Sequence, residues 1–285
     1  MFNKIFVVPK VGGANVAVSH EVIQHMKLVL SETDYNDVDL KIIGSAQDID
    51  ENTVAVPIGG DGTVLYTAKL LAEAGIDIPI IGFNLGQVGF LTDMQPTFGD
   101  IHKLYGSILG MDEPWCSKFV EDQRTLLSVT DEQGHEYMAL NDFVVSNLYS
   151  DNIIKYDLSI GESYAGNHKA NGVIVSTPTG STAYAMNVGG AIIEPDLDVV
   201  EIVPIAGMGL STRPIIVGGN NVITVEIKGL SGRIVAFKAD GRECGRFDNQ
   251  DVKITIKRHE KKVRLWHYEG WNFFDRIREK LNWNV

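Results

Sequence analysis

The chain has 285 residues, 44% of them hydrophobic and 22% charged, a composition typical of a globular protein with one large or two medium domains. Its formal net charge of −12 argues against broad nucleic-acid binding, which depends on many Lys and Arg contacts to phosphate. No apolar run reaches the roughly 20 residues of a membrane span. Two cysteines without paired spacing indicate free thiols, so we expect a cytoplasmic protein that binds neither nucleic acid nor membrane.

The first part of the chain alternates strands with helices. Strands are expected at residues 5–8, 40–43, 54–58 and 78–83. Helices are expected from Ser19 as cap to about Leu30, after Thr63 until Gly75, and over 98–109. Apolar residues recur at helical spacing in the first two helices, at Val22, Met26 and Val29 and at Leu65, Leu70, Leu71 and Ala74. This alternation predicts a mainly parallel sheet with helical crossovers, in a Rossmann-like α/β domain over 1–113.

The pattern of the sequence changes near Pro114, where turn residues begin to separate short apolar runs. We expect strands at 126–130, 143–146, 156–160, 173–176, 200–205, 222–227, 234–238, 252–256 and 263–266. One helix is expected after Gly180. The pattern predicts an antiparallel β-sandwich-like domain over 114–267. The tail, 268–285, is expected to form a helix on Phe274, Ile277 and Leu281 and to pack back on the first domain.

A glycine-dense turn, Gly59-Gly60-Asp61-Gly62-Thr63, follows the strand at 54–58. Ligands of parallel sheets bind beyond the carboxyl ends of the strands, and a helix N-terminus there attracts anions. A carboxylate among phosphate-binding amides would repel phosphate. We therefore expect Asp61 either to hold a divalent metal or to accept a proton from a hydroxyl. The alternative is a plain strand-to-helix turn with Asp61 as the helix cap.

Two further stretches carry polar side chains between apolar runs. Asn141-Asp142 offers an amide beside a carboxylate, a pair that suits the hydroxyls of a sugar but also occurs in ordinary turns. Residues 176–184, Ser-Thr-Pro-Thr-Gly-Ser-Thr-Ala-Tyr, place hydroxyl groups near an expected helix start. Tyr184 could stack on a base or nicotinamide ring. The alternative there is a capped helix with Tyr184 in the core.

Other patterns are missing or weak. No Gly-Lys-Ser/Thr follows a glycine loop, and the dinucleotide fingerprint fails because Leu65 stands where its third glycine should be. The seven histidines show no metal-ligand spacing, so no protein ligand to a metal is assigned. Candidate phosphate contacts are Lys169, Arg213, Lys238, Arg242 and Arg246.

Together, 59–63, 141–142 and 176–184 resemble the signature motifs of the NAD kinase family in order and separation. Residues 82–91 and Ala239-Asp240-Gly241 look like further family segments. The resemblance covers about residues 54 to 245. It implies an α/β domain followed by a β domain, and transfer of the γ-phosphate of ATP, or of polyphosphate, to the adenosine ribose 2′-hydroxyl of NAD. It also implies Mg²⁺ or another divalent cation and self-association as a dimer or tetramer.

The resemblance also assigns roles to residues. Asp61 would accept the proton of the ribose hydroxyl. The phosphate-cradling residues would be Gly59, Gly60, Gly62 and Thr63. The NAD-binding residues would be Asn141, Asp142, Lys169, Asn171, Thr182, Ala183, Tyr184, Asn187 and Ala206.

The chain departs from the family pattern at two positions. Asp142 stands where the family usually has Glu, and Asn171 where it usually has Asp. These departures keep open a non-catalytic NAD-binding sensor as an alternative. A lipid kinase of the diacylglycerol type is a second alternative, because that family has a similar glycine loop.

Overall fold

The computed structural model describes residues 4–10, 16–32, 39–42, 49–86, 89–110, 119–148, 153–209, 212–230, 234–248 and 251–283. The chain divides into two compact units, residues 1–123 with 263–285 and residues 124–262. Strands β5 (Phe119–Thr130) and β16 (Val252–Tyr268) each begin in one unit and end in the other. The domain bounds expected from the sequence stay a prediction, and Pro114 lies outside the described residues.

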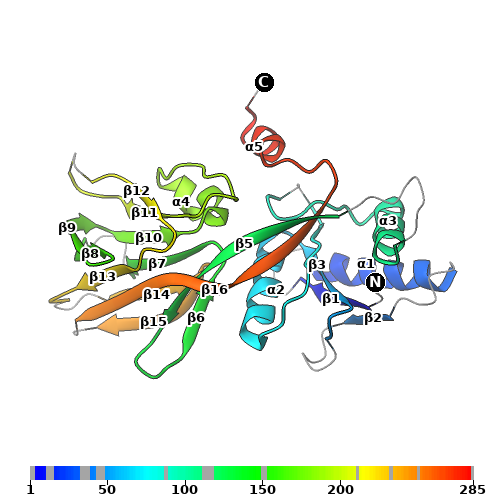
Figure 1. The fold of residues 1–285 in the computed structure, drawn as a ribbon, viewed down its shortest axis with the longest axis horizontal. Helices are drawn as coiled ribbons and strands as arrows, with labels where there is room; N and C mark the ends of the chain where they lie inside the picture. The colour runs from blue at the N-terminus through cyan, green and yellow to red at the C-terminus, as the bar shows by residue number, and fades with distance from the viewer. Residues whose placement is uncertain are drawn as a thin grey trace. The chain divides into compact units, whose positions relative to one another are not determined.

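The first unit contains a parallel four-stranded sheet in the order β2-β1-β3-β4 (Figure 1). Its strands are β1 (Lys4–Pro9), β2 (Asp39–Ile42), β3 (Thr53–Gly59) and β4 (Phe83–Asn84). The strand expected at 78–83 is reduced to β4 and to parallel bridges that Ile80 makes with Ala55 and Leu265. Pro79, which has no N–H, helps to explain why regular pairing does not extend further.

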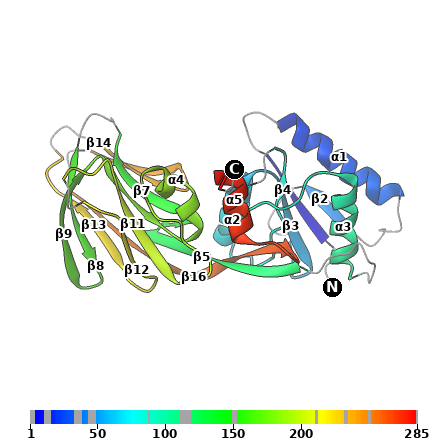
Figure 2. The same cartoon turned by 90° about the horizontal axis from the view of Figure 1, so that it is seen from above.

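Helices cover both faces of this sheet (Figure 2). On one face, α1 (Val16–Glu32) and α3 (Phe98–Ile108) share a buried cluster with Val7 and Val56. On the other lies α2 (Asp61–Ala74), which ends at Gly75 in the left-handed conformation, as predicted.

Two details of the predicted helices are wrong. Ser19 lies inside α1 rather than at its cap, and its Oγ donates to the Val16 carbonyl 2.7 Å away. In α2 the buried stripe is Val64, Ala68 and Leu71. Of the predicted residues Leu71 is buried, whereas Leu65 and Leu70 only flank the stripe and Ala74 is exposed.

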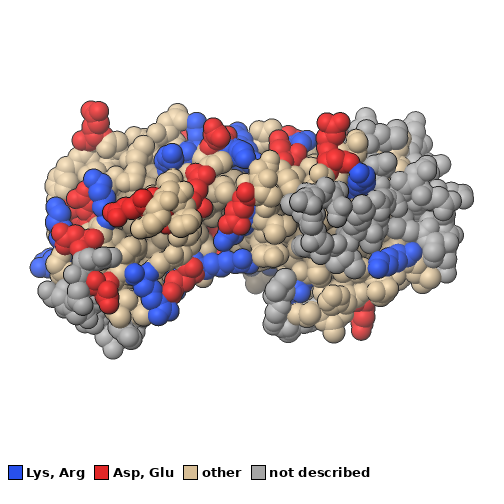
Figure 3. All heavy atoms as spheres, turned by 90° about the horizontal axis from the view of Figure 1, so that it is seen from below, with Lys and Arg blue, Asp and Glu red and all other residues tan. Residues whose placement is uncertain are grey.

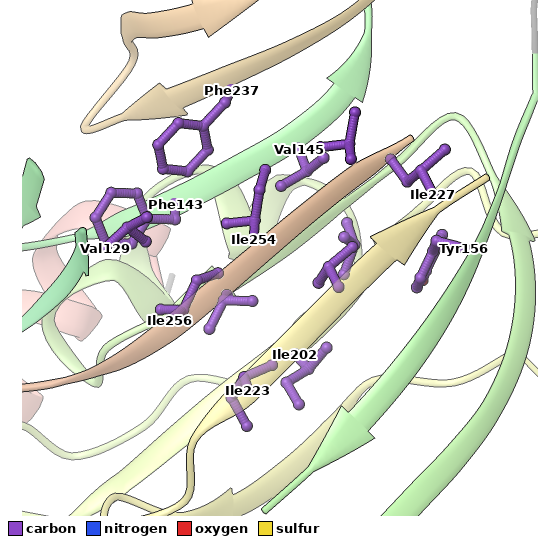
Figure 4. Packing of buried hydrophobic residues seen from close by; sticks show 14 of the residues in the cluster. Val129, Phe143, Val145, Tyr156, Ile202, Ile223, Ile227, Phe237, Ile254 and Ile256 are labelled. Atoms are coloured by element: carbon purple, nitrogen blue, oxygen red, sulfur yellow. The ribbon is translucent and has the colours of Figure 1, made fainter. Parts of the chain in front are cut away.

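The second unit is a sandwich of two antiparallel sheets, ordered β12-β11-β10-β7-β14-β15 and β6-β5-β16-β13-β8-β9. The strands not yet defined are β6 (Glu136–Ala139), β7 (Asp142–Asn147), β8 (Ile154–Ile160), β9 (Ser163–Ala170), β10 (Gly172–Ser176), β11 (Val199–Ile205), β12 (Ile215–Gly218), β13 (Ile223–Ile227), β14 (Ile234–Ala239) and β15 (Arg242–Asp248). Inward side chains of both sheets meet in one core (Figure 4), where Phe143 and Phe237 stack at 5.2 Å beside Ile254 and Ile256. The predicted fold class is therefore confirmed.

The sequence missed β6, β9, β12 and β15, and it divided β16 into two strands. Strands β9 and β15 lie at sheet edges and are mostly exposed, so they lack the apolar alternation that marks a half-buried strand. The expected helix after Gly180 is two short turns, a 3₁₀ turn (η2, Thr179–Thr182) and α4 (Tyr184–Asn187). Ala185 of α4 packs with Ile174 on the face of the first sheet that points away from the sandwich core.

The C-terminal helix α5 (Phe273–Leu281) belongs to the first unit. Asn272 caps it, because its Oδ1 accepts the amides of Phe274 and Asp275 at 2.8 and 3.2 Å. Its buried residues are Phe273 and Ile277, whereas the predicted Phe274 is 51% exposed. The buried stripe of this helix thus begins at Phe273, one residue before the predicted Phe274, and it includes the predicted Ile277.

Candidate functional site

The glycine loop lies where β3 ends at Gly59 and α2 begins at Asp61. Gly60 occupies the N-cap position, and no side chain caps the helix there. Asp61 is therefore the first helical residue, and the alternative interpretation of Asp61 as the helix cap is wrong. The Thr63 amide donates to the Gly60 carbonyl at 2.8 Å, which closes the first turn directly after the strand.

Backbone amides from the segment after β4 hold the Asp61 carboxylate. The Phe90 amide donates to Oδ2 at 2.9 Å, and the Leu91 amide donates to Oδ1 at 3.0 Å. A Cβ at Gly89 would lie 1.9 Å from Asp61 Oδ1, so only glycine leaves room for this contact. Because each carboxylate oxygen has a second lone pair, Asp61 is oriented and can still accept a proton or another donor.

The three glycines of the loop serve different purposes. A Cβ at Gly59 would lie 2.0 Å from Thr63 Oγ1, so packing inside the protein requires glycine there. At Gly60 and Gly62 a Cβ would meet nothing within 4 Å. The fold itself therefore does not explain the last two glycines, whereas a ligand that approaches the backbone closely at the start of a helix would.

In the second unit, Asn141 and Asp142 are fixed through their main chain. The Asp240 carboxylate accepts the amides of Leu140, Asn141 and Asp142 at 2.9, 2.7 and 3.2 Å. Asp240 and Gly241 form the tight turn between β14 and β15, and their φ values are 46° and 75°. An Asp-Gly pair is the sequence signal of such a hairpin turn, but this contact with residues 140–142 was not predicted.

The Asp142 side chain is 4% exposed and makes no hydrogen bond within the described part of the chain. Burial, together with the nearby Asp240 charge, raises the pKa of Asp142 to about 7. Asn141 is half-buried, and its side-chain amide likewise has no partner among the described residues. Buried polar groups normally find partners, so this pair has hydrogen-bonding capacity that a ligand could use.

Most hydroxyls of residues 176–182 make hydrogen bonds within the protein. Thr177 Oγ1 donates to the Leu140 carbonyl at 2.6 Å and accepts the Gly180 amide. Ser181 is fully buried and bonds to the Pro178 and Ile193 main chain. These bonds hold the short turns against Asn141, whose carbonyl oxygen would lie 2.1 Å from a Cβ at Gly180.

The turns present other predicted residues to solvent. Tyr184 is 41% exposed, so the alternative that placed it in the core is wrong. Asn187, one helical turn further along α4, is exposed, and Thr182 and Ala183 are half-buried.

The remaining predicted residues meet at the other end of β10. The Asn171 amide donates to the Ile205 carbonyl at 2.9 Å, and the Met208 amide donates to the Lys169 carbonyl at 2.8 Å. These bonds bring Lys169 and Asn171 beside Ala206, which has a φ of 47°, a strained conformation for alanine. The predicted residues of this unit therefore lie at the two ends of β10 and on α4.

Two of the other basic candidates already have hydrogen-bond partners within the protein. Arg246 is paired with Glu243, and Arg213 donates to the Thr212 carbonyl. Acidic and basic side chains are interspersed on the face drawn in Figure 3. Among the described residues, no group of three or more His, Cys, Asp or Glu side chains is arranged to hold a metal ion. None of the described helices is long and apolar enough to cross a membrane.

An acid-bearing glycine loop at the end of a parallel strand, with a separate β unit that carries the uncommitted side chains of Asn141 and Asp142, suits a phosphotransferase. Two family models match the chain, the ATP-NAD kinase N-terminal domain over residues 10–109 and the ATP-NAD kinase C-terminal domain over residues 140–267. The chain belongs to the NAD kinase family.

Curated relatives and solved structures agree with this. The chain is 35% identical to an NAD kinase of Methylibium petroleiphilum over 259 residues, which cover 88% of this chain and 80% of the relative. It is 37% identical to an NAD kinase of Teredinibacter turnerae over 232 residues, which cover 80% and 75%. Family membership decides against the lipid-kinase alternative.

Two solved structures share the fold. Yeast NADH kinase complexed with NADH superposes with a TM-score of 0.78 at 21% identity, covering 100% of this chain and 88% of that one. An NAD kinase from Archaeoglobus fulgidus in complex with ATP gives a TM-score of 0.72 at 24% identity, covering 98% of each chain.

Proposed function

We propose that this chain transfers the terminal phosphoryl group of ATP, or of polyphosphate, to the 2′-hydroxyl of the adenosine ribose of NAD. The observation that carries the proposal is the fixed Asp61 carboxylate beside an open glycine loop at the start of α2. Phosphoryl transfer depends mainly on positioning and on charge neutralisation. A loop that exposes backbone amides beside an oriented carboxylate supplies a place for the phosphates and an acceptor for a proton.

Asp61 acts in this proposal as the general base. A ribose hydroxyl is a poor nucleophile, and a base within hydrogen-bond reach contributes roughly 10²–10⁴-fold to the rate. The amides of Phe90 and Leu91 keep the carboxylate in one orientation, which leaves its remaining lone pairs for the hydroxyl. Gly59 and Thr63 shape the turn, and Gly60 and Gly62 leave room for the phosphates.

The second unit binds NAD in this proposal. Asn141 and Asp142 contact ribose hydroxyls through the side-chain groups that lack partners among the described residues. The exposed ring of Tyr184 stacks on the nicotinamide. The other contacts come from Lys169, Asn171, Thr182, Ala183, Asn187 and Ala206.

A divalent cation such as Mg²⁺ belongs to the proposal as part of the donor. Such a cation would supply positive charge that offsets the negative charge developing during transfer. Its ligands would be mainly phosphate oxygens, and no protein ligand is assigned. Self-association and a cytoplasmic location are also part of the proposal, and analytical ultracentrifugation of the purified chain tests the first.

The experiment is an assay of NADP formation. The purified protein is incubated with NAD, Mg²⁺ and either ATP or polyphosphate, and the product is measured with an NADP-specific dehydrogenase. We expect NADP with at least one donor and none when the divalent cation is chelated. Tight NAD binding without turnover for any donor or metal would overturn the proposal in favour of a non-catalytic NAD-binding sensor.

A further inference from the structure

A cluster of buried charged side chains in the first unit has no part in the proposed chemistry. His267, near the end of β16, is 2% exposed. Its Nδ1 lies 2.6 Å from Asp93 Oδ2, and its Nε2 lies 3.2 Å from Asp122 Oδ2. Trp271 stacks on the imidazole with 4.0 Å between ring centroids and 9° between planes. The imidazole therefore joins two carboxylates from different parts of the chain and is held flat by an aromatic ring.

The charges of this cluster balance when the imidazole is protonated. Ionised carboxylates only accept hydrogen bonds, so both ring nitrogens must donate. Burial alone would lower the pKa of His267, but the hydrogen bonds with Asp122 and Asp93 outweigh it, and the pKa is raised. Arg276 of α5 adds a second positive charge, with Nη2 3.8 Å from Asp93 Oδ1. Because the ring stands between the carboxylates, the three groups do not converge on a point where a metal ion could bind.

Asp93 lies two residues after Leu91, the second of the residues whose amides hold Asp61. The segment between them is tightly fixed, because Gly89 donates to Thr92 Oγ1 at 3.1 Å and Asp93 donates its amide to the Gly82 carbonyl at 3.2 Å. A Cβ at Gly82 would lie 2.9 Å from the Leu91 carbonyl oxygen, so the backbones pack in direct contact. A displacement of Asp93 would therefore pass to Leu91 and from there to Asp61.

We propose that His267, held by Asp122, is a positioning residue for the reaction: it anchors Asp93 and thereby fixes the Phe90 and Leu91 amides that orient Asp61. This inference rests on the proposed role of Asp61 as the base. It gives β16 and α5, which come last in the sequence, a part in arranging the loop at the end of β3. Every contact in this chain of interactions lies within the first unit.

A second ion pair between β5 and β16 provides a matched control. Glu121 of β5 accepts hydrogen bonds from Arg264 and Trp266 of β16, at 2.9 and 3.2 Å. It therefore joins the same two strands as Asp122 and His267, but in the described part of the chain it makes no hydrogen bond or ion pair with residues 89–94. Asp93→Ala removes the anchor and leaves the His267–Asp122 pair intact, whereas Glu121→Ala removes only the neighbouring link.

The first measurement is amide hydrogen exchange of Phe90 and Leu91 in the protein without substrates. We expect these amides to exchange roughly tenfold faster or more in Asp93→Ala and at the wild-type rate in Glu121→Ala. Exchange in β1 and β3 should not change. Equal acceleration throughout the first unit, or no change at Phe90 and Leu91, would overturn the proposal. Asp93→Asn, which keeps the volume of the side chain, replaces Asp93→Ala if that variant does not fold.

The second measurement is steady-state kinetics. A misplaced catalytic group costs roughly 10–100-fold in rate, so kcat should fall by that factor in Asp93→Ala with KM for NAD and ATP nearly unchanged. If Asp61→Asn abolishes turnover while Asp93→Ala keeps the wild-type kcat, the positioning proposal fails and the proposed function stands. If the wild-type protein makes no NADP, the proposed function fails, and the exchange experiment still decides whether the anchor exists.

Discussion

Asp61, the proposed general base, and Asp142, proposed to bind NAD, are fixed in opposite ways. Both side-chain oxygens of Asp61 accept hydrogen bonds from backbone amides, so the carboxylate itself is oriented. Asp142 is fixed through its backbone, which Asp240 holds, and its carboxylate has no hydrogen bond within the described residues. The first arrangement suits a group that must point at one atom. The second suits a group that reserves its hydrogen bonds for a ligand.

The largest effect is expected for Asp61→Asn. An amide cannot accept the hydroxyl proton in the way a carboxylate does, so kcat should fall about 10²–10⁴-fold. NAD binding, which we assign to the second unit, should be retained when measured by calorimetry. A wild-type kcat in this variant would show that Asp61 is not the general base, and the contrast with Asp142 would then have no bearing on catalysis.

Asp100→Asn is the control for that substitution. Asp100 is also an acidic residue in the first turn of a helix of the same unit, and its Oδ2 accepts the Gln95 amide at 3.1 Å. It carries the same type of bond without lying in the glycine loop. The kcat of Asp100→Asn should therefore match that of the wild type. An equal loss of kcat in Asp100→Asn and Asp61→Asn would indicate a general effect on folding.

Asp142 should make stability depend on pH in a characteristic direction. Its pKa is raised to about 7 in the folded protein, so folding favours the protonated form. The resulting stability is present below the unfolded pKa of 3.8 and is lost as pH rises to about 7, a change on the order of 2–4 kcal/mol. Asp142→Asn should flatten this dependence. Urea unfolding at pH 4.5 and 7.5 measures it.

Asp157→Asn is the opposite control for the pH experiment. Hydrogen bonds from Asn167 and Tyr164 lower the pKa of Asp157, so its contribution is present at neutral pH and lost as the pH falls. The two variants should therefore differ in the sign of their effect between acid and neutral pH. Identical pH profiles for wild type and Asp142→Asn would show that the Asp142 carboxyl is not buried as described.

Glycine substitutions sharpen the comparison at Asp61. In Gly89→Ala the new Cβ would lie 1.9 Å from Asp61 Oδ1, so the carboxylate must move, and kcat should fall roughly 10–100-fold. In Gly60→Ala nothing lies within 4 Å of the new Cβ, so the free energy of unfolding should stay within about 0.5 kcal/mol of the wild-type value. KM for ATP should nevertheless rise in Gly60→Ala. An unchanged KM would mean that phosphates do not approach this glycine.

The sequence predicted the helices and strands in which apolar residues recur at a regular spacing and a turn-forming residue marks the end. The parallel sheet, the helix ending at Gly75 and the position of the loop at 59–63 follow from local pattern. The exposed edge strands β9 and β15 do not, because nothing in their composition requires pairing. The partners of the site residues could not be predicted either. Asp240 lies about 100 residues from Asn141, and His267 is 174 residues from Asp93, so only the folded chain reveals these contacts.

The smallest effect is expected for Asp240→Asn, which tests how Asp142 is held. Asparagine tolerates the φ of 46° at this position but keeps only one side-chain oxygen to accept the three amides. Losing one charged hydrogen bond costs about 1.5 kcal/mol, so KM for NAD should rise about tenfold with little change in kcat. Removing the Asp240 charge should also lower the pKa of Asp142 toward its ordinary value.

Asp131→Asn is the matched control for Asp240→Asn, because Asp131 accepts the amides of Gln133 and His135 in the turn before β6. That variant changes a similar turn in the same unit without touching residues 140–142. If both variants raise KM for NAD equally, the effect reflects general loosening of the sandwich. A rise confined to Asp240→Asn would show that the fixed backbone of Asp142 matters because it presents an uncommitted carboxylate to the nucleotide.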